Sequence, residues 1–547
     1  MNYRVFAAVA ALGVVPSLAL ASEQTCLDAA GMAVEGVTVD AAEWAPAGED
    51  SPVDHCIVSA RMAERTGADG NAYAIRFELR LPDAWEGRFL HQFNGGNDGE
   101  VKPALGGGVG VDAGGPALAR GFAVVSSDAG HDGAAHPESG LVGGNMFGFD
   151  FEARRDYGYG AVAKLHPVAL EMVTAYYGQA PDYVYGYGGS NGGRHAMVAA
   201  ERMPGAFDGL LAGFPGFNLP KAAVQHAWDV QNFRSFGKGL ADSFTREDLA
   251  AASAAILAAC DGLDGLEDGV VNDYMGCQAA FDPASMTCTD GQNSACLAPE
   301  QTEALTRIHA GPTNSAGEAL YNSWYWEPGI SGGNWRFWKL ESPIPPWGNK
   351  PIIAVMGAGS LAQIFSTPPA AVDGTPEALE ASLMAYDFDT DAPKIYATSE
   401  DFPESPMQVM TPPNAADPTL ADYQAAGGKL IVFHGVADPV FSFKDTQDWY
   451  DRLAANNPDA DDFTRLYAVP GMNHGPSGNA ADGMDLMGAL IDWVEGSTAP
   501  GVVPTAFRAD NEEAGENAGA ERPLCPYPTH AVYTGGDAAS MASFACE

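Results

Sequence analysis

A glycine-rich segment around Ser190 has the residue types and spacing of a nucleophilic hydrolase. Residues 186–193 read Gly-Tyr-Gly-Gly-Ser-Asn-Gly-Gly, so Ser190 has a glycine two positions away on either side. The strand-like run 183–185 precedes this segment and the helix-like run 194–202 follows it. A sharp strand-to-helix turn strains the serine backbone, lifts the hydroxyl clear of the sheet and directs backbone N–H groups toward a developing oxyanion. The pattern favours such a nucleophile elbow over a simple glycine-rich turn, and it predicts a serine hydrolase.

A serine nucleophile needs a base and a group that orients the base. In elbow hydrolases the acid and then the histidine follow the serine along the chain. Asp438 comes just after the apolar run 430–433, and His474 comes just after the run 463–469. Both therefore fall on loops at the carboxyl ends of predicted strands, the edge at which Ser190 should also emerge. Asp438 alone reads more readily as the start of an Asp-Pro turn, and His474 alone reads equally as a loop histidine, but their joint placement predicts a triad of Ser190, Asp438 and His474.

Stabilisation of an oxyanion needs two backbone N–H donors. Asn191, directly after the nucleophile, is expected to supply one. The apolar run 88–93 leads into paired glycines, and Gly95 or Gly96 is the candidate for the second donor, with a simple β-turn as the open alternative. Three other titratable residues near these motifs are expected to be structural or to support the triad: His195, Glu201 and His434.

The first residues predict export. Residues 1–4 carry one positive charge, an apolar run covers 5–15, and Ala-Leu-Ala at 19–21 is a small-x-small cleavage site, so residues 1–21 are predicted to be a signal peptide. No later stretch approaches ~20 apolar residues without charge. We expect a secreted or periplasmic protein with no membrane partner.

Cysteine content and charge narrow the possible partners. In an exported chain the even number of cysteines, eight, predicts four disulfides. Many pairings are possible, and proximity suggests Cys26–Cys56, Cys260–Cys277, Cys288–Cys296 and Cys525–Cys546. The net charge is −43, from 28 basic and 71 acidic residues. Such a surface repels polyanions, so nucleic acid is not an expected partner. The sequence does not fix the oligomeric state, and a monomer is favoured.

Strand-like and helix-like segments alternate ahead of the elbow. Strand patterns cover 73–81 and 121–126, and an amphipathic helical run covers 159–177. The same rhythm returns at 429–434. This alternation predicts an α/β fold in which helices cover both faces of a parallel sheet.

The alternation is interrupted over a long region of irregular composition. Residues 218–412 hold six of the ten tryptophans and four of the eight cysteines. We expect this region to be a domain inserted between two parts of one core, 22–217 and 413–547. Residues 510–521 are polar and are expected to form a surface loop.

An acidic loop at 261–270 reads Asp-Gly-Leu-Asp-Gly-Leu-Glu-Asp-Gly-Val. Its carboxylates, spaced by turn-forming glycines, could surround one hard cation with oxygen, and the flanking cysteines favour a structural calcium site. The glycine and glutamate positions do not match an EF-hand, and an acidic surface turn is the alternative. A catalytic metal held by Asp128, His131 and His136 is less favoured, because these residues lie in a glycine-rich loop without helical ligand spacing.

These features together resemble the tannase and feruloyl esterase family of α/β-hydrolases, which includes mono(2-hydroxyethyl) terephthalate esterases. The resemblance covers nearly the whole mature chain, including the segments 121–131, 186–193, 203–209, 261–270, 425–438, 469–474 and 522–528. It implies an α/β-hydrolase fold with a large inserted lid, and Ser190, Asp438 and His474 as the triad. It also implies calcium in the lid, bound by the side chains of Asp261, Asp264 and Asp268 and the carbonyls of Leu266 and Val270.

One departure from the family pattern concerns a disulfide. Family members commonly carry a cysteine before the serine and another after the histidine, joined beneath the triad. Here these positions are Gly189 and Gly475. Alignment of the triad must then rest on packing and hydrogen bonds, and we expect a more mobile His474 loop.

A second departure concerns the substrate. The sequence has no arginine between Arg336 and Arg452, so a guanidinium clamp for a free carboxylate would have to come from Arg336, or its role from Lys350. Lid tryptophans could instead form a flat aromatic pocket, although a lid core is their commoner use. The resulting prediction is a serine carboxylesterase that hydrolyses small aromatic esters through an acyl-enzyme. Hydrolysis of mono(2-hydroxyethyl) terephthalate or other aryl or alkyl esters is the alternative, and a polyphenol- or carbohydrate-binding protein on a hydrolase scaffold is the non-enzymatic one.

Overall fold

The fold is described from a computed structural model, which covers residues 22–48, 51–289 and 295–547. The predicted signal peptide, residues 1–21, lies outside this part of the chain. Among the described residues no helix is both long enough and apolar enough to cross a membrane.

Within these residues nine strands form one mixed sheet in the order β1-β2-β3-β5-β4-β6-β7-β8-β9. The strands are β1 (Val37–Ala45), β2 (His55–Thr66), β3 (Ala72–Pro82), β4 (Arg88–Gln92), β5 (Phe122–Ser127), β6 (Tyr183–Gly189), β7 (Gly209–Gly213), β8 (Lys429–Gly435) and β9 (Thr464–Val469). From β5 to β9 all neighbours are parallel. Every residue of β5 and β7 is buried, as expected for parallel strands covered on both faces.

The prediction of a parallel sheet is correct for its centre and wrong for its first edge. Strands β1, β2 and β3 pair antiparallel, and β3 joins β5 in the same sense. The last six residues of β2 are exposed or partly exposed, whereas the first six are largely buried. Antiparallel strands tolerate one solvated face. The exposed end of this antiparallel edge therefore needs no helix to cover it. The alternation of strands and helices along the chain begins only after β3.

Sixteen helices are found among the described residues, most of them in the segments that connect these strands. They are α1 (Glu23–Asp28), α2 (Phe151–Arg155), α3 (Ala161–Tyr177), α4 (Asn191–Arg202), α5 (Leu219–Arg234), α6 (Leu240–Ser243), α7 (Arg246–Cys260), α8 (Tyr274–Ala280), α9 (Pro299–Ala310), α10 (Gly333–Lys339), α11 (Ile352–Gln363), α12 (Pro376–Met384), α13 (Pro406–Met410), α14 (Ala421–Ala425), α15 (Phe443–Asn456) and α16 (Leu486–Gly496). Helices α3, α4 and α15 pack on one face of the sheet, and α16 packs on the other. The strand core is thus enclosed between two helical layers.

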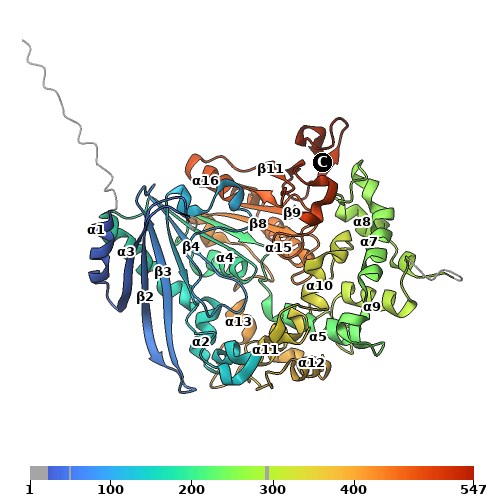
Figure 1. Cartoon of the computed structure of the whole chain (residues 1–547), viewed down its shortest axis with the longest axis horizontal. Coiled ribbons are helices and arrows are strands. Elements are labelled where there is room, and N and C mark those ends of the chain that lie inside the picture. The colour runs from blue at the N-terminus through green and yellow to red at the C-terminus, as the bar shows by residue number, and fades with distance from the viewer. Residues whose placement is uncertain (1–21, 49–50, 290–294) are drawn as a thin grey trace, which may run out of the picture.

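The chain leaves the sheet after β7 and returns at β8, which pairs directly with β7. The long intervening segment contains helices α5 to α14, most of which gather beside the sheet on the right and lower side of Figure 1. These helices have an apolar core of their own, built from residues such as Val230, Ile256, Leu305 and Ile353. The same core includes Phe147, from the segment before α2, so the inserted region packs firmly on the strand-bearing part.

The C-terminal residues form two small sheets. Strands β10 (Gly483–Met484), β11 (Val503–Ala506) and β12 (Glu521–Leu524) make one, and β13 (Ala531–Tyr533) and β14 (Phe544–Cys546) make the other. The segment 510–521 lies at the surface as expected, with most of its residues exposed, and it includes short 3-10 turns. Residues Glu512–Asn517 form a 3-10 helix, and Glu513 accepts hydrogen bonds from the backbone of Gly333 and Gly478, 2.7 Å each. The polar sequence suits this solvated segment, and the two hydrogen bonds of Glu513 anchor it to the rest of the fold.

All eight cysteines are paired. The disulfides join Cys26 to Cys56, Cys260 to Cys277, Cys288 to Cys296 and Cys525 to Cys546, the pairs that proximity in the chain suggests. The expectation that this chain is marked by a missing disulfide is therefore not borne out for the chain as a whole, because four disulfides cross-link it. Positions 189 and 475 remain glycines.

Candidate active site

Ser190 lies on a strained turn between β6 and α4. Its backbone has φ 62° and ψ −124°, a conformation that L-residues rarely adopt. A Cβ atom on Gly188 would lie 2.6 Å from the carbonyl oxygen of Phe93, and one on Gly192 would strike the same oxygen. Only glycine fits at these two positions, which explains the spacing seen in the sequence. The turn carries the Ser190 side chain to the carboxyl edge of the sheet.

Three side chains form a continuous hydrogen-bonded chain at this edge. The Nε2 atom of His474 is 2.9 Å from Oγ of Ser190, and Nδ1 of the same ring is 2.7 Å from Oδ2 of Asp438. Asp438 follows β8 and His474 follows β9, so adjacent strands hold the two loops side by side. This geometry suits a hydroxyl that gives its proton to an imidazole whose other nitrogen is fixed by a carboxylate.

The Asp438 carboxylate is fully buried and fully bonded. Its Oδ1 atom accepts hydrogen bonds from the backbone N–H groups of Val440 and Phe441, at 2.7 and 3.0 Å. Burial by itself would raise the pKa of Asp438, but the charges of His474 and His434 and the hydrogen bonds from both rings lower it well below its usual range. Asp438 is therefore ionised at neutral pH and can stabilise a positive imidazolium.

His434 supports Asp438 rather than Ser190. Its Nδ1 atom bonds the hydroxyl of Thr446 at 2.9 Å, its Nε2 atom bonds the carbonyl of Phe441 at 3.1 Å, and the same Nε2 lies 3.4 Å from Oδ2 of Asp438. The sequence placed this histidine among structural or supporting residues, and its contacts agree.

The candidate oxyanion donors lie around Ser190 in different ways. Gly96 and Asn191 line the same cavity as Ser190. Asn191 is the first residue of α4, where backbone N–H groups have no partner within the helix. Gly95 lies next to Ser190, since a Cβ on it would be 3.8 Å from Cβ of Ser190, but it does not line the cavity. The arrangement favours Gly96 over Gly95 as the second donor.

The Asn191 side chain is held by a buried polar network that the sequence did not reveal. Its Nδ2 atom donates to Asp98 at 2.9 Å, and its Oδ1 atom accepts from Nε of Arg194 at 2.6 Å. Arg194 is fully buried and also donates to the carbonyls of Gly158 and Tyr157. Burial raises the pKa of Asp98 well above its usual range, although the charge of Arg194 opposes this. The network fixes the start of α4 directly behind the nucleophile.

Two residues of the inserted region hold the His474 loop. Asn334 accepts a hydrogen bond from the His474 backbone N–H at 3.3 Å and donates to the His474 carbonyl at 3.1 Å. Glu327 accepts from the N–H of Gly471 at 2.8 Å and from that of Gly329 at 2.6 Å. The expected alignment of the triad by hydrogen bonds thus has an identified source, whereas the expected mobility of the loop stays a prediction.

Aromatic rings surround the His474 imidazole. The rings of Phe214, Trp338 and Phe441 pack edge-on against it, with centroid distances of 5.1, 4.9 and 5.2 Å. They leave His474 only 8% exposed. The packing keeps bulk water from the base while Ser190 stays open to the adjoining cavity.

The cavity beside Ser190 measures about 230 Å³. Its walls come from the core and from the inserted region, and they are mostly apolar, including Leu219, Ala223, Met356, Phe365 and Val440. Lysine and arginine are absent from the described residues that line it. Arg336 instead bonds Glu341 and two backbone carbonyls, and Lys350 pairs with Glu380, so neither offers the carboxylate clamp considered from the sequence.

A model of the family described as tannase and feruloyl esterase matches residues 59–547. The chain belongs to this family. The mono(2-hydroxyethyl) terephthalate hydrolase of Piscinibacter sakaiensis is 40% identical to it over 93% of this chain and 88% of that protein. A probable feruloyl esterase of Arthroderma benhamiae is 29% identical over 92% of this chain and 87% of that protein. As a member of the family, the protein is a carboxylic ester hydrolase.

Solved structures agree on the fold. Feruloyl esterase B from Aspergillus oryzae superposes with a TM-score of 0.75 at 22% identity, covering 96% of this chain and all of that one. Tannin acyl hydrolase from Aspergillus niger gives a TM-score of 0.68 at 20% identity, covering 96% of this chain and 95% of that one. These likenesses confirm the predicted α/β-hydrolase fold with its inserted region.

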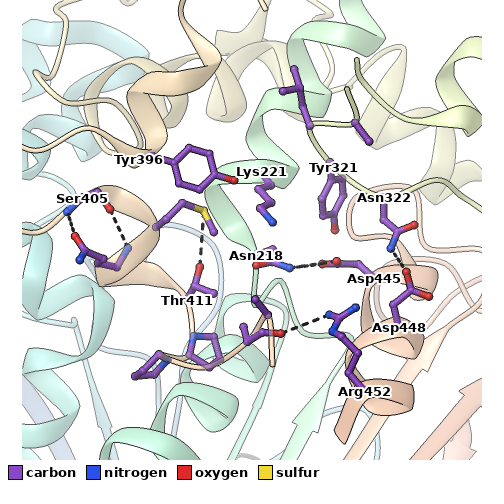
Figure 2. A pocket seen from close by; sticks show the side chains of 18 of the residues that line it. Asn218, Lys221, Tyr321, Asn322, Tyr396, Ser405, Thr411, Asp445, Asp448 and Arg452 are labelled. Atoms are coloured by element: carbon purple, nitrogen blue, oxygen red, sulfur yellow. Dashed lines mark hydrogen bonds between the residues drawn. The ribbon is translucent and has the colours of Figure 1, made fainter. Parts of the chain in front are cut away.

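A larger cavity, of about 1,220 Å³, lies elsewhere in this esterase (Figure 2). It is lined by Lys221 of α5, Tyr321, Tyr396 and the side chains of Asp445 and Arg452 on α15. No triad residue is among the described residues that line it. Its size therefore does not make it the reaction site, because the hydroxyl, imidazole and carboxylate meet at the smaller cavity.

The acidic loop carries several carboxylates, but most of their oxygens are already hydrogen-bonded or ion-paired within the protein. Asp264 accepts from Leu266 N and from both the backbone and side chain of Asn272, and Asp268 pairs with Arg522 at 2.6 Å. Burial raises the pKa of Asp261, and the nearby charge of Asp268 raises it further. Among the described residues no group of three or more His, Cys, Asp or Glu side chains is arranged to hold a metal ion. Calcium in this loop stays a proposal.

The other candidates from the sequence lie outside the triad cavity or in structural roles. Asp128 pairs with Arg76 at 2.7 Å, His131 bonds the Asn97 carbonyl, and His136 lies 3.1 Å from Glu138. This arrangement does not resemble a catalytic metal centre. The sequence suggested that tryptophans of the inserted region could form an aromatic pocket, but among them only Trp338 is a described residue that lines the Ser190 cavity. Trp324 instead donates a hydrogen bond to the Asp438 carbonyl at 3.0 Å.

Proposed function

We propose that this esterase is secreted and hydrolyses small aromatic carboxylic esters through an acyl-enzyme on Ser190. The observation that carries the proposal is the bonded series from Asp438 through His474 to Ser190, which ends at a mostly apolar cavity. Family membership supports ester hydrolysis, and feruloyl esterases among the relatives support an aromatic acyl group.

The proposed reaction has two halves, acylation of Ser190 and then hydrolysis of the acyl-enzyme. Nε2 of His474 takes the proton of Ser190 as Oγ attacks the ester carbonyl carbon, and the carbonyl oxygen gains the displaced electron pair. Backbone N–H groups of Asn191 and of Gly96 bind that oxygen. The intermediate then expels the alkoxide, which receives the proton from His474. Water repeats the same steps on the acyl-enzyme, releasing the carboxylic acid and restoring Ser190.

The test is labelling and loss of activity at one residue. An alkyl phosphonate should add a single mass increment to the protein on Ser190, and Ser190→Ala should lower kcat by roughly three to six orders of magnitude. Ser382→Ala, on the lid helix α12, is the matched control and should retain parental turnover. Parental turnover in Ser190→Ala would refute the assignment.

Hydrolysis of a terephthalate monoester is the second candidate. The 40% identical relative from Piscinibacter sakaiensis favours it. Among the described residues that line the cavity no cationic side chain is present to meet the free carboxylate of such a substrate. Burial of an unpaired carboxylate is costly, so uncharged aromatic acyl groups are the better match.

Three further features complete the proposal. Residues 218–412 act as a lid domain over the site, supported by their contacts with the His474 loop and by their contribution to the cavity walls.

Secretion is supported by four disulfides, which are typical of oxidising compartments. Calcium would be bound by Asp261, Asp264 and Asp268 with two backbone carbonyls, and its role there would be structural, remote from the reacting atoms.

A further inference from the structure

The large cavity of about 1,220 Å³ lies away from the triad, between the inserted region and the core (Figure 2). It exceeds the roughly 300–1,000 Å³ of pockets that hold drug-sized ligands. The segments around Tyr321 and Thr411 line one part of it, and Asp445 and Arg452 of α15 line another. The cavity therefore has room for a ligand of several linked units.

Three cationic side chains line this cavity: Arg202, Lys221 and Arg452. None of them forms an ion pair with a described residue. The Nζ atom of Lys221 is neither buried nor hydrogen-bonded to a described residue, and Arg452 makes only one long bond, 3.4 Å, to the carbonyl of Ala415. Figure 2 shows Lys221 and Arg452 extending toward the same space. Both side chains thus keep hydrogen-bond donors free at the cavity.

Carboxylates in the same lining balance these cations. Asp445 accepts hydrogen bonds from Nδ2 of Asn218 at 2.9 and 3.1 Å. Asp448 accepts one from Asn322 at 2.7 Å, and Glu404 also lines the cavity. Burial raises the pKa of Asp445 to about 6, while the hydrogen bond from Asn218 and the charges of nearby cations oppose the shift. Asp445 is therefore largely ionised at pH 7, and the formal charges of the lining cancel.

An exposed aromatic ring completes the lining. Tyr396, the last residue of the 3-10 helix Ala392–Tyr396, is 56% exposed, and its hydroxyl makes no hydrogen bond with a described residue. Tyr321, on the other side of Lys221 in Figure 2, is held by a hydrogen bond from the backbone N–H of Ser442 at 3.2 Å. A free aromatic face beside fixed polar groups matches a ligand that has both an apolar face and many hydroxyl groups.

An apolar layer separates this cavity from the one beside Ser190. Tyr321 lines the large cavity, Val440 and Phe441 line the small one, and all three belong to one cluster with Ala222. No described residue lines both cavities. A ligand in the large cavity therefore leaves Ser190 free.

We propose that the large cavity is a binding site for a neutral oligosaccharide, separate from the reaction site. The C–H face of a sugar ring packs on Tyr396. The sugar hydroxyls, which both donate and accept, bond the cations Lys221 and Arg452 and the carboxylate of Asp445. A polyanion is the poorer match, because it would meet the carboxylates of the lining on a chain of net charge −43. This inference does not depend on which acyl group the enzyme removes.

Isothermal titration calorimetry with cellotetraose, xylotetraose and maltotetraose tests the proposal. At least one of these sugars should bind the parent with a Kd of about 1 mM or lower. The same Kd should be found after Ser190 has been labelled with a phosphonate, because the two cavities are separate. Tyr396→Ala should weaken binding by about tenfold or more, whereas Tyr396→Phe, which keeps the ring, should stay within about threefold of the parent.

Two lysine variants provide a matched comparison. Lys221→Met should weaken binding by about fivefold or more, since it removes a free donor from the cavity. Lys444→Met is the control, because Lys444 lies on α15 over the ring of Tyr325 and does not line the cavity. It should keep the parental Kd. The melting temperature of each variant verifies that it is folded.

Four results would overturn the inference. They are no detectable binding of any of the three sugars, an unchanged Kd in Tyr396→Ala, loss of binding after phosphonate labelling, and tighter binding of tetragalacturonate than of every neutral sugar. The last would show that the ligand is anionic. None of them bears on ester hydrolysis at Ser190, so the proposed function is decided by its own test.

Discussion

Asn334 of the inserted region and His474 are joined by two reciprocal hydrogen bonds: the His474 backbone N–H donates to the Asn334 side-chain oxygen, and the Asn334 amide donates to the His474 carbonyl. The two residues are 140 positions apart in the chain. The base of the triad therefore owes its position partly to a helix of the inserted region, α10, and only partly to the strand that precedes it. The relationship can be tested by removing the amide.

Asn334→Ala should lower kcat by about tenfold with a smaller effect on KM, because loss of two neutral hydrogen bonds costs about 1–2 kcal/mol and acts on the position of the base. Steady-state kinetics and the melting temperature would be measured together. Asn322→Ala, which removes a lid bond to Asp448 on α15, is the control and should leave kcat unchanged. Equal losses in both variants would mean that the effect is general destabilisation.

Glu327 makes stability depend on pH near neutrality. Burial raises its pKa from 4.5 to about 7, although hydrogen bonds from Gly329 and Gly471 oppose the shift. The folded protein therefore binds a proton that the unfolded chain has released between about pH 4.5 and 7, so this residue destabilises the fold as pH rises through that window. The free energy of unfolding of Glu327→Gln, relative to the parent, should increase from pH 5 to pH 8 by on the order of 3 kcal/mol at most. A pH-independent difference between the two proteins would contradict this linkage.

A disulfide beneath the triad should not form readily in this chain. A Cβ at position 189 would lie 2.5 Å from the Phe214 ring, which packs against His474, and position 475 has φ +90°, a region unfavourable for any residue but glycine. Gly189→Cys with Gly475→Cys should therefore lower the melting temperature and retain free thiols. Addition of Phe214→Ala should increase the fraction of disulfide found by thiol titration. Full cross-linking and a higher melting temperature without that third change would show that Phe214 is no obstacle.

Calcium bound in the acidic loop would raise the thermal stability of the protein and would take no part in catalysis. If the proposal holds, EDTA should lower the melting temperature by a few degrees and added calcium should restore it. Asp261→Asn should abolish the response, whereas Asp282→Asn, at a cap elsewhere in the lid, should preserve it. An EDTA-insensitive melting temperature in the parent would end the proposal.

The sequence was most informative where one local rule applied. Gly188 and Gly192 are required by the turn at Ser190, and Asp438 and His474 follow strands that are buried along nearly their whole length, so their common edge could be predicted. Cysteine pairing also followed chain proximity. The antiparallel edge of β1 to β3 was missed because its strands alternate between buried and exposed residues, a weaker pattern than the fully buried central strands.

Residues that act across long separations could not be predicted. Asp98, Arg194 and Asn334 are polar residues without a motif, and their roles come only from partners brought close by folding. The prediction of an aromatic pocket from the tryptophans was only partly correct. Composition cannot distinguish Trp338, which lines the cavity, from tryptophans such as Trp326 and Trp335 that pack in the core of the inserted region.

The hydrogen bond from Trp324 to the Asp438 carbonyl, together with those made by Asn334 and Glu327, has a consequence for protein engineering. Excision of the inserted region to leave a minimal hydrolase would remove supports of both the acid and the base, not merely a cover. A shortened enzyme should therefore retain the nucleophile on its turn yet lose the alignment that makes it reactive, so redesign for new substrates is better confined to side chains facing the cavity.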